Sequence, residues 1–493
     1  MIEQFCNSIL QQKIPQTKAL ANLIMGLASQ TNAKSVVEVS ESPCYHYQYS
    51  SISKVITALV GKKTALKNTE ESKVNAKAIK DSFLKIKSDN LPNCQDNFWL
   101  MNTDMSPLFR RYSPTLPNRG YVYKPNNQIK GNKPVDIGYE FSCVGLSCRQ
   151  GRYGVSEPTW NLPLSMELVP SEENKNLFTA KQVNEILENK NFPFHKELTV
   201  NSLDSNYSSP EYIATTYHQP CLVNIIRLAS NRNVWDQQSE EEQKERRNSN
   251  EDNRGANSVY GQKYSLNQEP NWDKSCDDKI EFCIKIGKRK YVVEVREWKN
   301  MMIRTKRKLS MKDKSCRLIA VRLLDEEGNP IFKNTLWLSV WGERNGELSL
   351  EEIFWAYRLR FDIEHFFRFG KQRLLLDKFE TPIEAHMGIW LEVVALAYWT
   401  LWVGRESAKY ECPKWQQYDK NRKKRAEYNL LASPSEVQRE LERIILSFEQ
   451  KPFIPKLRKK GTGRKEGIKL PKRNKYLVIK KAKKAANCSK LQI

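Results

Sequence analysis

The stretch YRLRFDIEHFFRFGK, residues 357–371, gathers cations, carboxylates and aromatic rings within fifteen positions. On an α-helix, with about 100° per residue, four of its polar side chains fall within an arc of about 60°. These are Tyr357, Arg360, Glu364 and Lys371. The opposite side is apolar and contains Leu359, Ile363, Phe366 and Phe367. The stretch therefore predicts a helix with a buried back and a front that presents a phenol, a guanidinium, a carboxylate and an ammonium group.

Spacing alone leaves two interpretations of this front open. Arg and Lys suit phosphate oxygens, Arg as a planar fork and Lys as a point charge. A carboxylate between them repels DNA unless a divalent cation bridges it to the phosphate. The alternative is an ordinary solvated helix face, on which the charged groups form (i, i+4) and (i, i+7) ion pairs.

The charge of the whole chain points to a polyanionic partner. The 493 residues include 81 Lys and Arg against 57 Asp and Glu, for a net charge of +24. Such a surface attracts nucleic acid first and an anionic membrane surface second. The last 43 residues contain sixteen Lys or Arg and one acid, Glu466, so more than half of the excess lies there. We expect a disordered basic tail that grips phosphates.

Cysteine, histidine and hydropathy patterns argue against several other classes. Eleven cysteines without a CxxC pair, and only five histidines, exclude a zinc site with the usual ligand spacing and favour reduced thiols. The N-terminus MIEQFCNSILQQK lacks the pattern of a signal peptide. The apolar run at 388–404 contains Glu392 and is at the short limit for a bilayer span, so we expect a buried core helix. These features favour a cytoplasmic protein with no membrane partner.

Shifts in composition divide the chain into five parts. Residues 1–92 have helical periodicity and predict a DNA-binding region or a plain helical cap. Residues 93–232 predict three strands, a helix, a strand, a helix and a strand, which is an α/β plan. Residues 233–346 begin as a polar loop and continue as alternating β-strands. Residues 347–410 contain two long predicted helices, at about 349–373 and 382–407, and 411–493 contain a C-terminal helix and the basic tail.

The spacing of Tyr357, Arg360, Glu364 and Lys371 resembles the Y-R-E-K signature of bacterial insertion-sequence transposases of the DDE type. The stretches YVYKPNNQIKGNKP and SNRNVW and the basic tail are similar to a cyanobacterial-type branch of these enzymes. The similarity extends over most of the chain. It implies a ribonuclease H-like mixed-sheet core that is interrupted by a β-rich insertion domain.

The resemblance also implies two catalytic aspartates, one on the first strand and one just after the fourth. Asp104, at the end of the predicted strand FWLMNTDMSP, fits the first position. Asp96, before that strand, and Asp136, at the start of the next, are alternatives. Asp204 ends the alternating strand LTVNSLD and fits the second position, although an aspartate there also caps turns and helices.

Glu364 is expected to be the third catalytic carboxylate, whereas Glu351 and Glu352 lie near the helix start and favour its dipole. Together, Asp104, Asp204 and Glu364 would hold two Mg²⁺ ions, with Mn²⁺ as a substitute. Hard cations of this kind prefer carboxylate oxygens. A metal pair clamps the attacking and leaving oxygens of a phosphodiester during hydrolysis and transesterification.

The DNA contacts follow from the same resemblance. Tyr357, Arg360 and Lys371 would contact phosphates near the cleaved strand. An aromatic residue of the insertion domain would stack on a flipped base, and Trp337 fits this role, with Trp298 and Trp341 as alternatives. A buried strand tryptophan is the competing interpretation of Trp337. In the tail, GTGRKEG, with Arg464 and Lys465, is similar to a degraded minor-groove hook.

The resemblance therefore implies a DNA transposase that cuts at the terminal inverted repeats of an insertion sequence and joins the 3′-OH ends to target DNA. It implies a homodimer in the synaptic complex and a place at the bacterial nucleoid. Two alternatives stay open. One is a non-catalytic or domesticated transposase-derived DNA-binding protein, and the other is a nuclease that cuts without joining.

Overall fold

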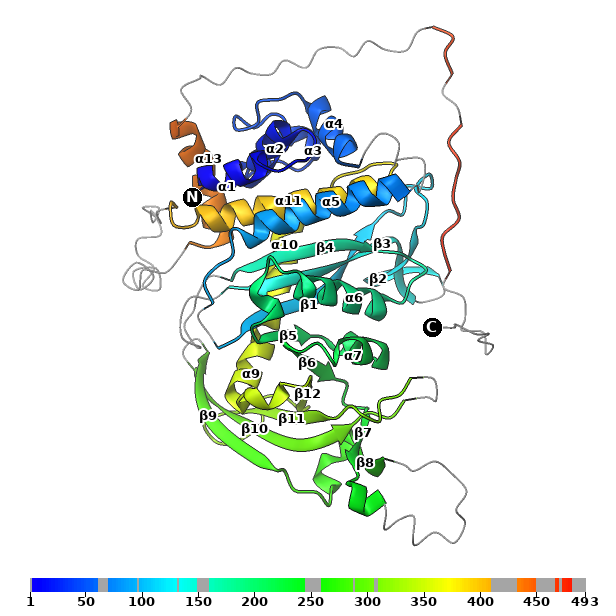
Figure 1. The fold of residues 1–493 in the computed structure, drawn as a ribbon, viewed down its shortest axis with the longest axis vertical. Helices are drawn as coiled ribbons and strands as arrows, with labels where there is room; N and C mark the ends of the chain where they lie inside the picture. The colour runs from blue at the N-terminus through cyan, green and yellow to red at the C-terminus, as the bar shows by residue number, and fades with distance from the viewer. Residues whose placement is uncertain are drawn as a thin grey trace.

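Twelve strands of the described chain form one mixed sheet in the computed structural model (Figure 1). The structure describes residues 2–60, 70–94, 97–130, 133–148, 159–243, 259–286, 289–305, 309–408, 432–448, 466–469 and 472–480. The strands are β1 Trp99–Phe109, β2 Gly120–Lys130, β3 Lys133–Ser147, β4 Asn161–Val169, β5 Thr199–Leu203, β6 Leu222–Leu228, β7 Asn233–Gln237, β8 Tyr260–Ser265, β9 Asp278–Ile286, β10 Arg289–Met302, β11 Cys316–Leu324 and β12 Leu336–Trp341. The predicted α/β class is confirmed.

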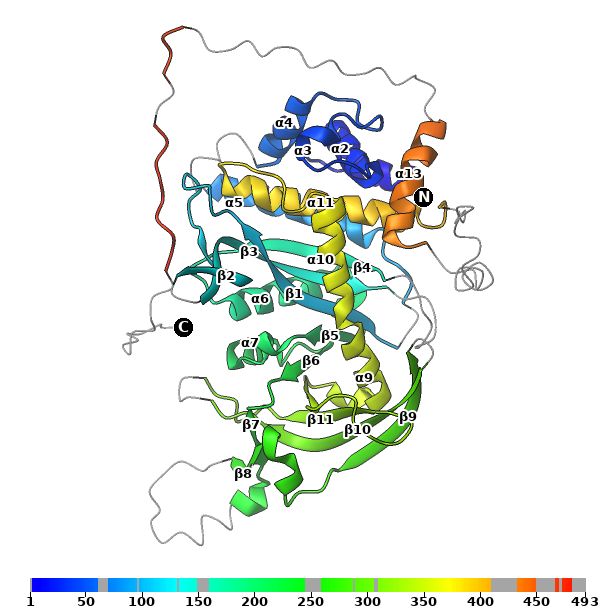
Figure 2. The same cartoon turned by 180° about the vertical axis from the view of Figure 1, so that it is seen from behind.

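Helices cover both faces of this sheet. The α-helices are α1 Ile2–Leu10, α2 Thr17–Ser29, α3 Val36–Val39, α4 Tyr49–Val60, α5 Glu70–Ser88, α6 Lys175–Glu188, α7 Pro210–Thr216, α9 Leu350–Arg358, α10 Asp362–Arg373, α11 Glu384–Gly404 and α13 Pro434–Phe448. Figure 1 shows α6 and α7 in front of the central strands, and Figure 2 shows α9 and α10 on the opposite side.

The centre of the sheet is parallel. Strand β5 pairs in parallel with both β1 and β6, while β3 pairs antiparallel with β1 and β4 antiparallel with β3. Both β5 and β6 are covered on two faces, and β5 is buried at every position. Nearly continuous burial of this kind is typical of parallel strands between helical layers.

The β-rich segment extends this sheet and does not form a separate one. Strand β12 pairs antiparallel with β6, and β11, β10, β7 and β8 follow outward in that order. The prediction of an inserted domain at 233–346 is therefore right about its β-content, but its strands continue the core sheet. Without β12, the edge of β6 would expose unpaired backbone N–H and C=O groups. Pairing with β12 satisfies these groups.

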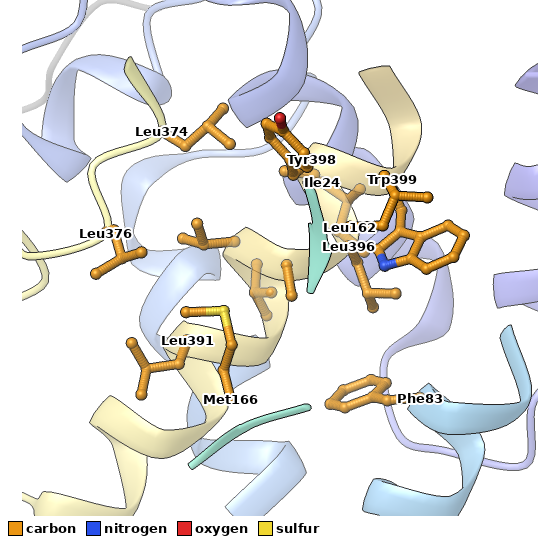
Figure 3. Packing of buried hydrophobic residues seen from close by; sticks show 14 of the residues in the cluster. Ile24, Phe83, Leu162, Met166, Leu374, Leu376, Leu391, Leu396, Tyr398 and Trp399 are labelled. Atoms are coloured by element: carbon orange, nitrogen blue, oxygen red, sulfur yellow. The ribbon is translucent and has the colours of Figure 1, made fainter. Parts of the chain in front are cut away.

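Helix α11 is the centre of the helical half of the molecule. It packs against β4, α2, α4 and α13, and Figure 3 shows its Leu396 and Trp399 beside Ile24 of α2 and Leu162 of β4. By length and hydropathy α11 could span a membrane, but 83% of its most apolar window is buried inside the protein. The core helix expected at this position is confirmed. The N-terminal helices join the same apolar cluster, so they form a cap over α11, and their DNA binding stays a prediction.

Glu392, the one acid inside the apolar run of α11, forms an ion pair with a lysine of α5. Lys87 of α5 places its Nζ 2.5 Å from Glu392 Oε2 and donates a second hydrogen bond, of 2.8 Å, to Leu164 O. The other oxygen of Glu392 accepts a 2.9 Å hydrogen bond from the backbone N–H of Met166. Lys87 is fully buried. This pair joins α5, β4 and α11, which are far apart in the sequence.

The predicted disordered tail is ordered at 472–480. Tyr476 N donates to Pro114 O at 2.9 Å, Ile479 N donates to Arg119 O at 2.8 Å, and Ile479 forms a parallel bridge with Gly120 at the start of β2. Figure 1 shows this segment, in red, ending beside β2. These contacts place the end of the described chain against the sheet.

Replacing Lys87 by Met should lower the free energy of unfolding by about 3–5 kcal/mol, because Glu392 would stay buried without its cation. Urea unfolding followed by circular dichroism measures the change. Lys85→Met, in the same helix, is the matched control, since its pair with Asp89 is exposed and should contribute no more than about 1 kcal/mol. Equal losses in the two variants would contradict the role of the buried pair.

Candidate functional site

Asp104 lies in the middle of β1, not at its end as predicted, because β1 continues to Phe109. The β1–β5 ladder, however, stops at the pair Thr103 and Leu203. From Asp104 onward β1 keeps β3 on one side and has lost its parallel neighbour on the other. The backbone N–H of Met105 donates to Asp104 Oδ1 at 2.8 Å. The Asp104 carboxylate thus lies just beyond the point at which β1 and β5 cease to pair.

Asp204 follows the last residue of β5 and lies level with Asp104 in the register. Its side chain accepts a 2.6 Å hydrogen bond from the N–H of Ser205 and caps the short 3₁₀ helix η2, Ser205–Tyr207. The predicted catalytic position and the alternative role as a cap therefore describe the same geometry. The cap fixes the orientation of the carboxylate.

Glu364 lies in the first turn of α10, after a break that the sequence pattern did not predict. A 3₁₀ turn, η5 Leu359–Phe361, separates α9 from α10, so the single helix expected at 349–373 is wrong there. Two sheet side chains bind carbonyl groups around this break: Asn102 Nδ2 donates to Leu359 O at 3.0 Å, and Ser202 Oγ donates to Ala356 O at 2.9 Å. A 3₁₀ stretch inside a helix often marks a functional position.

Arg360 connects the carboxylates. Its Nη1 lies 3.6 Å from Asp104 Oδ2 and its Nη2 lies 3.0 Å from Glu364 Oε1. Only 4% of Arg360 is exposed, so this part of the helix front is not the solvated face of the alternative interpretation. Its Nε is buried and has no hydrogen-bond partner among the described residues. Although burial works against its charge, Tyr357 and the three carboxylates raise the pKa of Arg360 above its usual value.

Asp104 is electrostatically strained. Burial raises its pKa to about 6, and the negative charges of Asp204 and Glu364 act in the same direction. The Met105 N–H and Arg360 oppose this shift without cancelling it. A carboxylate perturbed by burial and by like charges is typical of a functional site. Asp104 and Glu364 both pair with Arg360, and Asp204 stands level with Asp104 in the register, so the three carboxylates lie in one region.

The two other signature residues are also close to β1 or to the carboxylates. Tyr357 is buried at the end of α9, and burial raises its pKa. Lys371 Nζ donates to Ser106 Oγ at 2.7 Å and to Pro107 O at 3.2 Å. Burial lowers the pKa of Lys371. All four residues of the Y-R-E-K pattern therefore lie along one side of the site.

Arg227 is a candidate that the sequence analysis missed. The ladders pair Thr103 with Leu203 and Leu203 with Ile226, so Asp104, Asp204 and Arg227 stand level on three neighbouring strands. Arg227 is the exposed position of an otherwise buried strand, and its charge acts on Tyr357. A single cation within the apolar run LVNIIRL was the available signal.

The predicted base-stacking role of Trp337 does not fit this conformation. Trp337 is 2% exposed and packs between Trp272, at 5.6 Å between ring centroids, and Trp298, at 5.7 Å. The alternatives Trp298 and Trp341 are buried as well. The structure shows the buried strand tryptophan that was the competing interpretation, because β12 is an inner strand of the extended sheet.

The remaining acidic and basic residues that were predicted lie away from the site or outside the described residues. Asp136 is buried and pairs with Lys124 at 3.1 Å, where β3 meets β2. Glu352 completes a capping box with Ser349 at the start of α9, as a helix-start role predicts. Three predicted positions lie outside the described residues: Asp96, Arg464 and Lys465.

The carboxylates of Asp104, Asp204 and Glu364 are suitable ligands for a hard divalent cation, but they do not form a closed metal site. Within the described ranges, no three His, Cys, Asp or Glu side chains are grouped as a metal site. Glu364 is paired with Arg360, but its side chain is 47% exposed. The Glu364 carboxylate is therefore accessible to a divalent ion, although the Arg360 side chain, which is 5% exposed, would lose one of its partners when Glu364 turned to that ion.

Comparison of the chain with protein-family models and with curated proteins finds no match. The chemistry of the site is nevertheless specific. Carboxylates from β1 and α10 lie beside the guanidinium of Arg360, Asp204 stands level with Asp104 at the end of β5, Arg227 follows on β6, and Lys371 binds β1. This arrangement suits a ligand with phosphate oxygens and a divalent counter-ion.

In chelator, Asp104→Asn should be more stable than the unchanged protein at pH 8 but not at pH 4. The pKa of Asp104 is about 6 in the folded state against an ordinary 3.8, so stability is full below pH 4 and falls as the pH rises through 6. The difference at pH 8 should approach about 3 kcal/mol. Urea unfolding at both pH values measures it, and a pH-independent difference would contradict the strained carboxylate.

Proposed function

We propose that this chain is a DNA transposase of the DDE type, which cuts at the ends of an insertion sequence and joins the 3′-OH ends to target DNA. One observation carries the proposal: Asp104 and Glu364, far apart in the sequence, both pair with Arg360, and Asp204 stands level with Asp104 at the end of the neighbouring strand. The resemblance in the Y-R-E-K spacing implies these three positions.

The strand order supports a ribonuclease H-like core for this proposal. Strand β2 pairs only with the first part of β3, which leaves β1, β3, β4 and β5 as the first four strands of the core. Asp104 is then on the first strand and Asp204 just after the fourth. Glu364 comes from a helix that packs against β1 and β4. This is the placement that such a core requires.

Asp104, Asp204 and Glu364 would hold the Mg²⁺ ions of this reaction, and Mn²⁺ would substitute. When bound, such ions supply Lewis-acid stabilisation of phosphate charge and a water of lowered pKa. The protein side chains do the rest. Asp104 is held by Met105 N–H, and Asp204 by Ser205 N–H, so two of the three carboxylates have fixed orientations before any ligand binds.

Cations near these carboxylates would bind the DNA backbone. Arg360 has a buried Nε–H without a partner in the described chain, and a phosphate oxygen is a suitable acceptor for it. Lys371 is fixed against β1 by its two hydrogen bonds. Arg227 lies on the other side, level with Asp204. A scissile phosphate between these groups would face the carboxylates.

Partners and place in the cell follow from the same proposal. The charge of +24 suits double-stranded DNA, both the terminal inverted repeats and the target. We propose a homodimer in the synaptic complex and a bacterial cytoplasmic, nucleoid-associated protein. The alternative is a non-catalytic or domesticated transposase-derived protein that binds DNA through the N-terminal helices and tail. It predicts the same salt-sensitive binding but no cleavage.

Asp104→Ala, Asp204→Ala and Glu364→Ala should each abolish divalent-ion-dependent DNA cleavage, because each removes a proposed metal-binding carboxylate. DNA binding in chelator should stay within about threefold, since a lost negative charge does not weaken attraction to phosphates. Cleavage of DNA carrying the ends of the element measures the first effect and fluorescence anisotropy the second. Glu351→Ala is the control, because Glu351 is exposed in the first turn of α9. Cleavage by any of the three variants would refute the site, and no cleavage by the unchanged protein favours the non-catalytic alternative.

Arg227→Gln should reduce cleavage at least tenfold, as expected for the loss of one charged hydrogen bond to the transition state. The stability of the fold should change little because the side chain is exposed. Single-turnover cleavage and thermal unfolding measure the two effects. Arg232→Gln, at a half-buried arginine just beyond β6 that donates to Ser208, serves for comparison. Equal rates for the two variants would remove Arg227 from the site.

A further inference from the structure

The ordered C-terminal segment 472–480 reaches the cleft that contains Asp104. This cleft has a volume of about 1130 Å³. One wall comes from β1 and from η2, and another comes from the start of α6. Ile479 and Lys480 complete the lining. Residues of β1 and residues of the C-terminal segment, which are far apart in the sequence, thus line one cavity.

Backbone contacts fix the segment in place. The guanidinium of Arg119 is buried and donates to Tyr476 O at 3.2 Å, while also binding the carbonyls of Leu116 and Arg110. Tyr476 N and Ile479 N donate in return to Pro114 O and Arg119 O. The segment therefore docks against the start of β2 through main-chain hydrogen bonds and one isolated parallel bridge.

The charges explain why such a segment would be needed. Without it the cleft is lined by four carboxylates, those of Asp104, Glu140, Glu172 and Glu173, and by the single cation Lys175. Lys175 is moreover paired with Glu140. A nucleic-acid strand would be repelled there. Residues 472–480 bring four exposed cations and no acid: Lys472, Arg473, Lys475 and Lys480.

We propose that residues 472–480 are a strap that closes this cleft beside Asp104, with Lys480 in its lining, and that the cations of the strap form a wall along which a DNA backbone enters. Arg119 is its positioning residue. This rests on the proposed function in taking DNA as the substrate, but docking of the strap and binding of DNA can be measured without cleavage. The strap is thus distinct from a tail that binds phosphates at no fixed place.

A pair of proline variants of the full chain tests the strap at constant charge. Ile479→Pro removes the N–H that binds Arg119 O, whereas Leu477→Pro removes an N–H that makes no hydrogen bond among the described residues, and Leu477 is exposed. Hydrogen exchange should show protected amides at Tyr476 and Ile479 in the unchanged protein. Protection at Tyr476 should be lost in Ile479→Pro and retained in Leu477→Pro. Unprotected amides in the unchanged protein would overturn the docking.

Binding of a duplex with a single-stranded 3′ overhang, in chelator, tests the cationic wall. Ile479→Pro should weaken binding about tenfold and reduce the slope of log K against log salt by about 3, as expected when four cations leave their positions. Leu477→Pro should bind like the unchanged protein. If Ile479→Pro releases the segment but binds with unchanged affinity and slope, the wall is refuted. Failure of cleavage alone would count against the proposed function and leave the strap standing.

Two further comparisons separate position from charge. Chains that end at Lys480 and at Leu470 both lose residues 481–493, but only the second loses the strap, so only the second should show the additional fall in salt slope. Glu172→Gln in the Ile479→Pro background should recover about twofold in affinity, because it removes one of the carboxylates that the strap offsets. No difference between the truncated chains, or no recovery by Glu172→Gln, would contradict the charge argument.

Discussion

One rung of the β1–β5 ladder determines where the functional groups lie. Asn102 and Ser202 are paired residues on neighbouring parallel strands, and both donate to carbonyl groups around the interruption between α9 and α10. These hydrogen bonds fix the position of the 3₁₀ turn between α9 and α10 relative to the two strands. The break in turn brings Arg360 inward, against the carboxylates that stand two residues further along the same strands. A shift of one residue in this register would turn Asp104 and Asp204 to the opposite face.

The site contains charged side chains in a buried region, where an ionised group is destabilising. Arg360 is buried with an unsatisfied Nε, and Asp104 holds its proton to higher pH than an ordinary aspartate. Neither feature benefits the fold alone, since a buried carboxylate beside like charges favours unfolding above its pKa. Lys87 and Glu392, by contrast, form a buried pair with further hydrogen bonds to the backbone. A buried carboxylate of raised pKa beside a buried cation with an unused donor is expected where a ligand completes the arrangement.

The hydrophobic period predicted the buried back of the 357–371 stretch, but not that Tyr357 and Arg360 of its polar front are buried as well. The alternating pattern predicted the strand LTVNSLD, which ends one residue earlier than expected, at Leu203. The break at Leu359–Phe361 could not be predicted, because its cause is two hydrogen bonds from strands more than 150 positions away. The length of β1 was misjudged because Pro107 suggested an end, yet β3 continues to pair with it. Strand β2 was not predicted at all, since Pro125 and two asparagines interrupt its apolar pattern. Arg227 needed the strand register, which no local pattern contains.

The continuity of the sheet limits how this architecture can be shortened. Strand β12 shares five backbone pairings with β6, and Gly342, at φ +124°, lets the chain leave β12 within contact of Leu222 O. Excising the segment from β7 to β12 would uncover the whole flank of β6 as an unprotected edge, open to self-association. The added strands thus act as a permanent cover for the half of the sheet that contains β1, β5 and β6. A working abbreviated version would have to bring another element to shield the same row of amides and carbonyls.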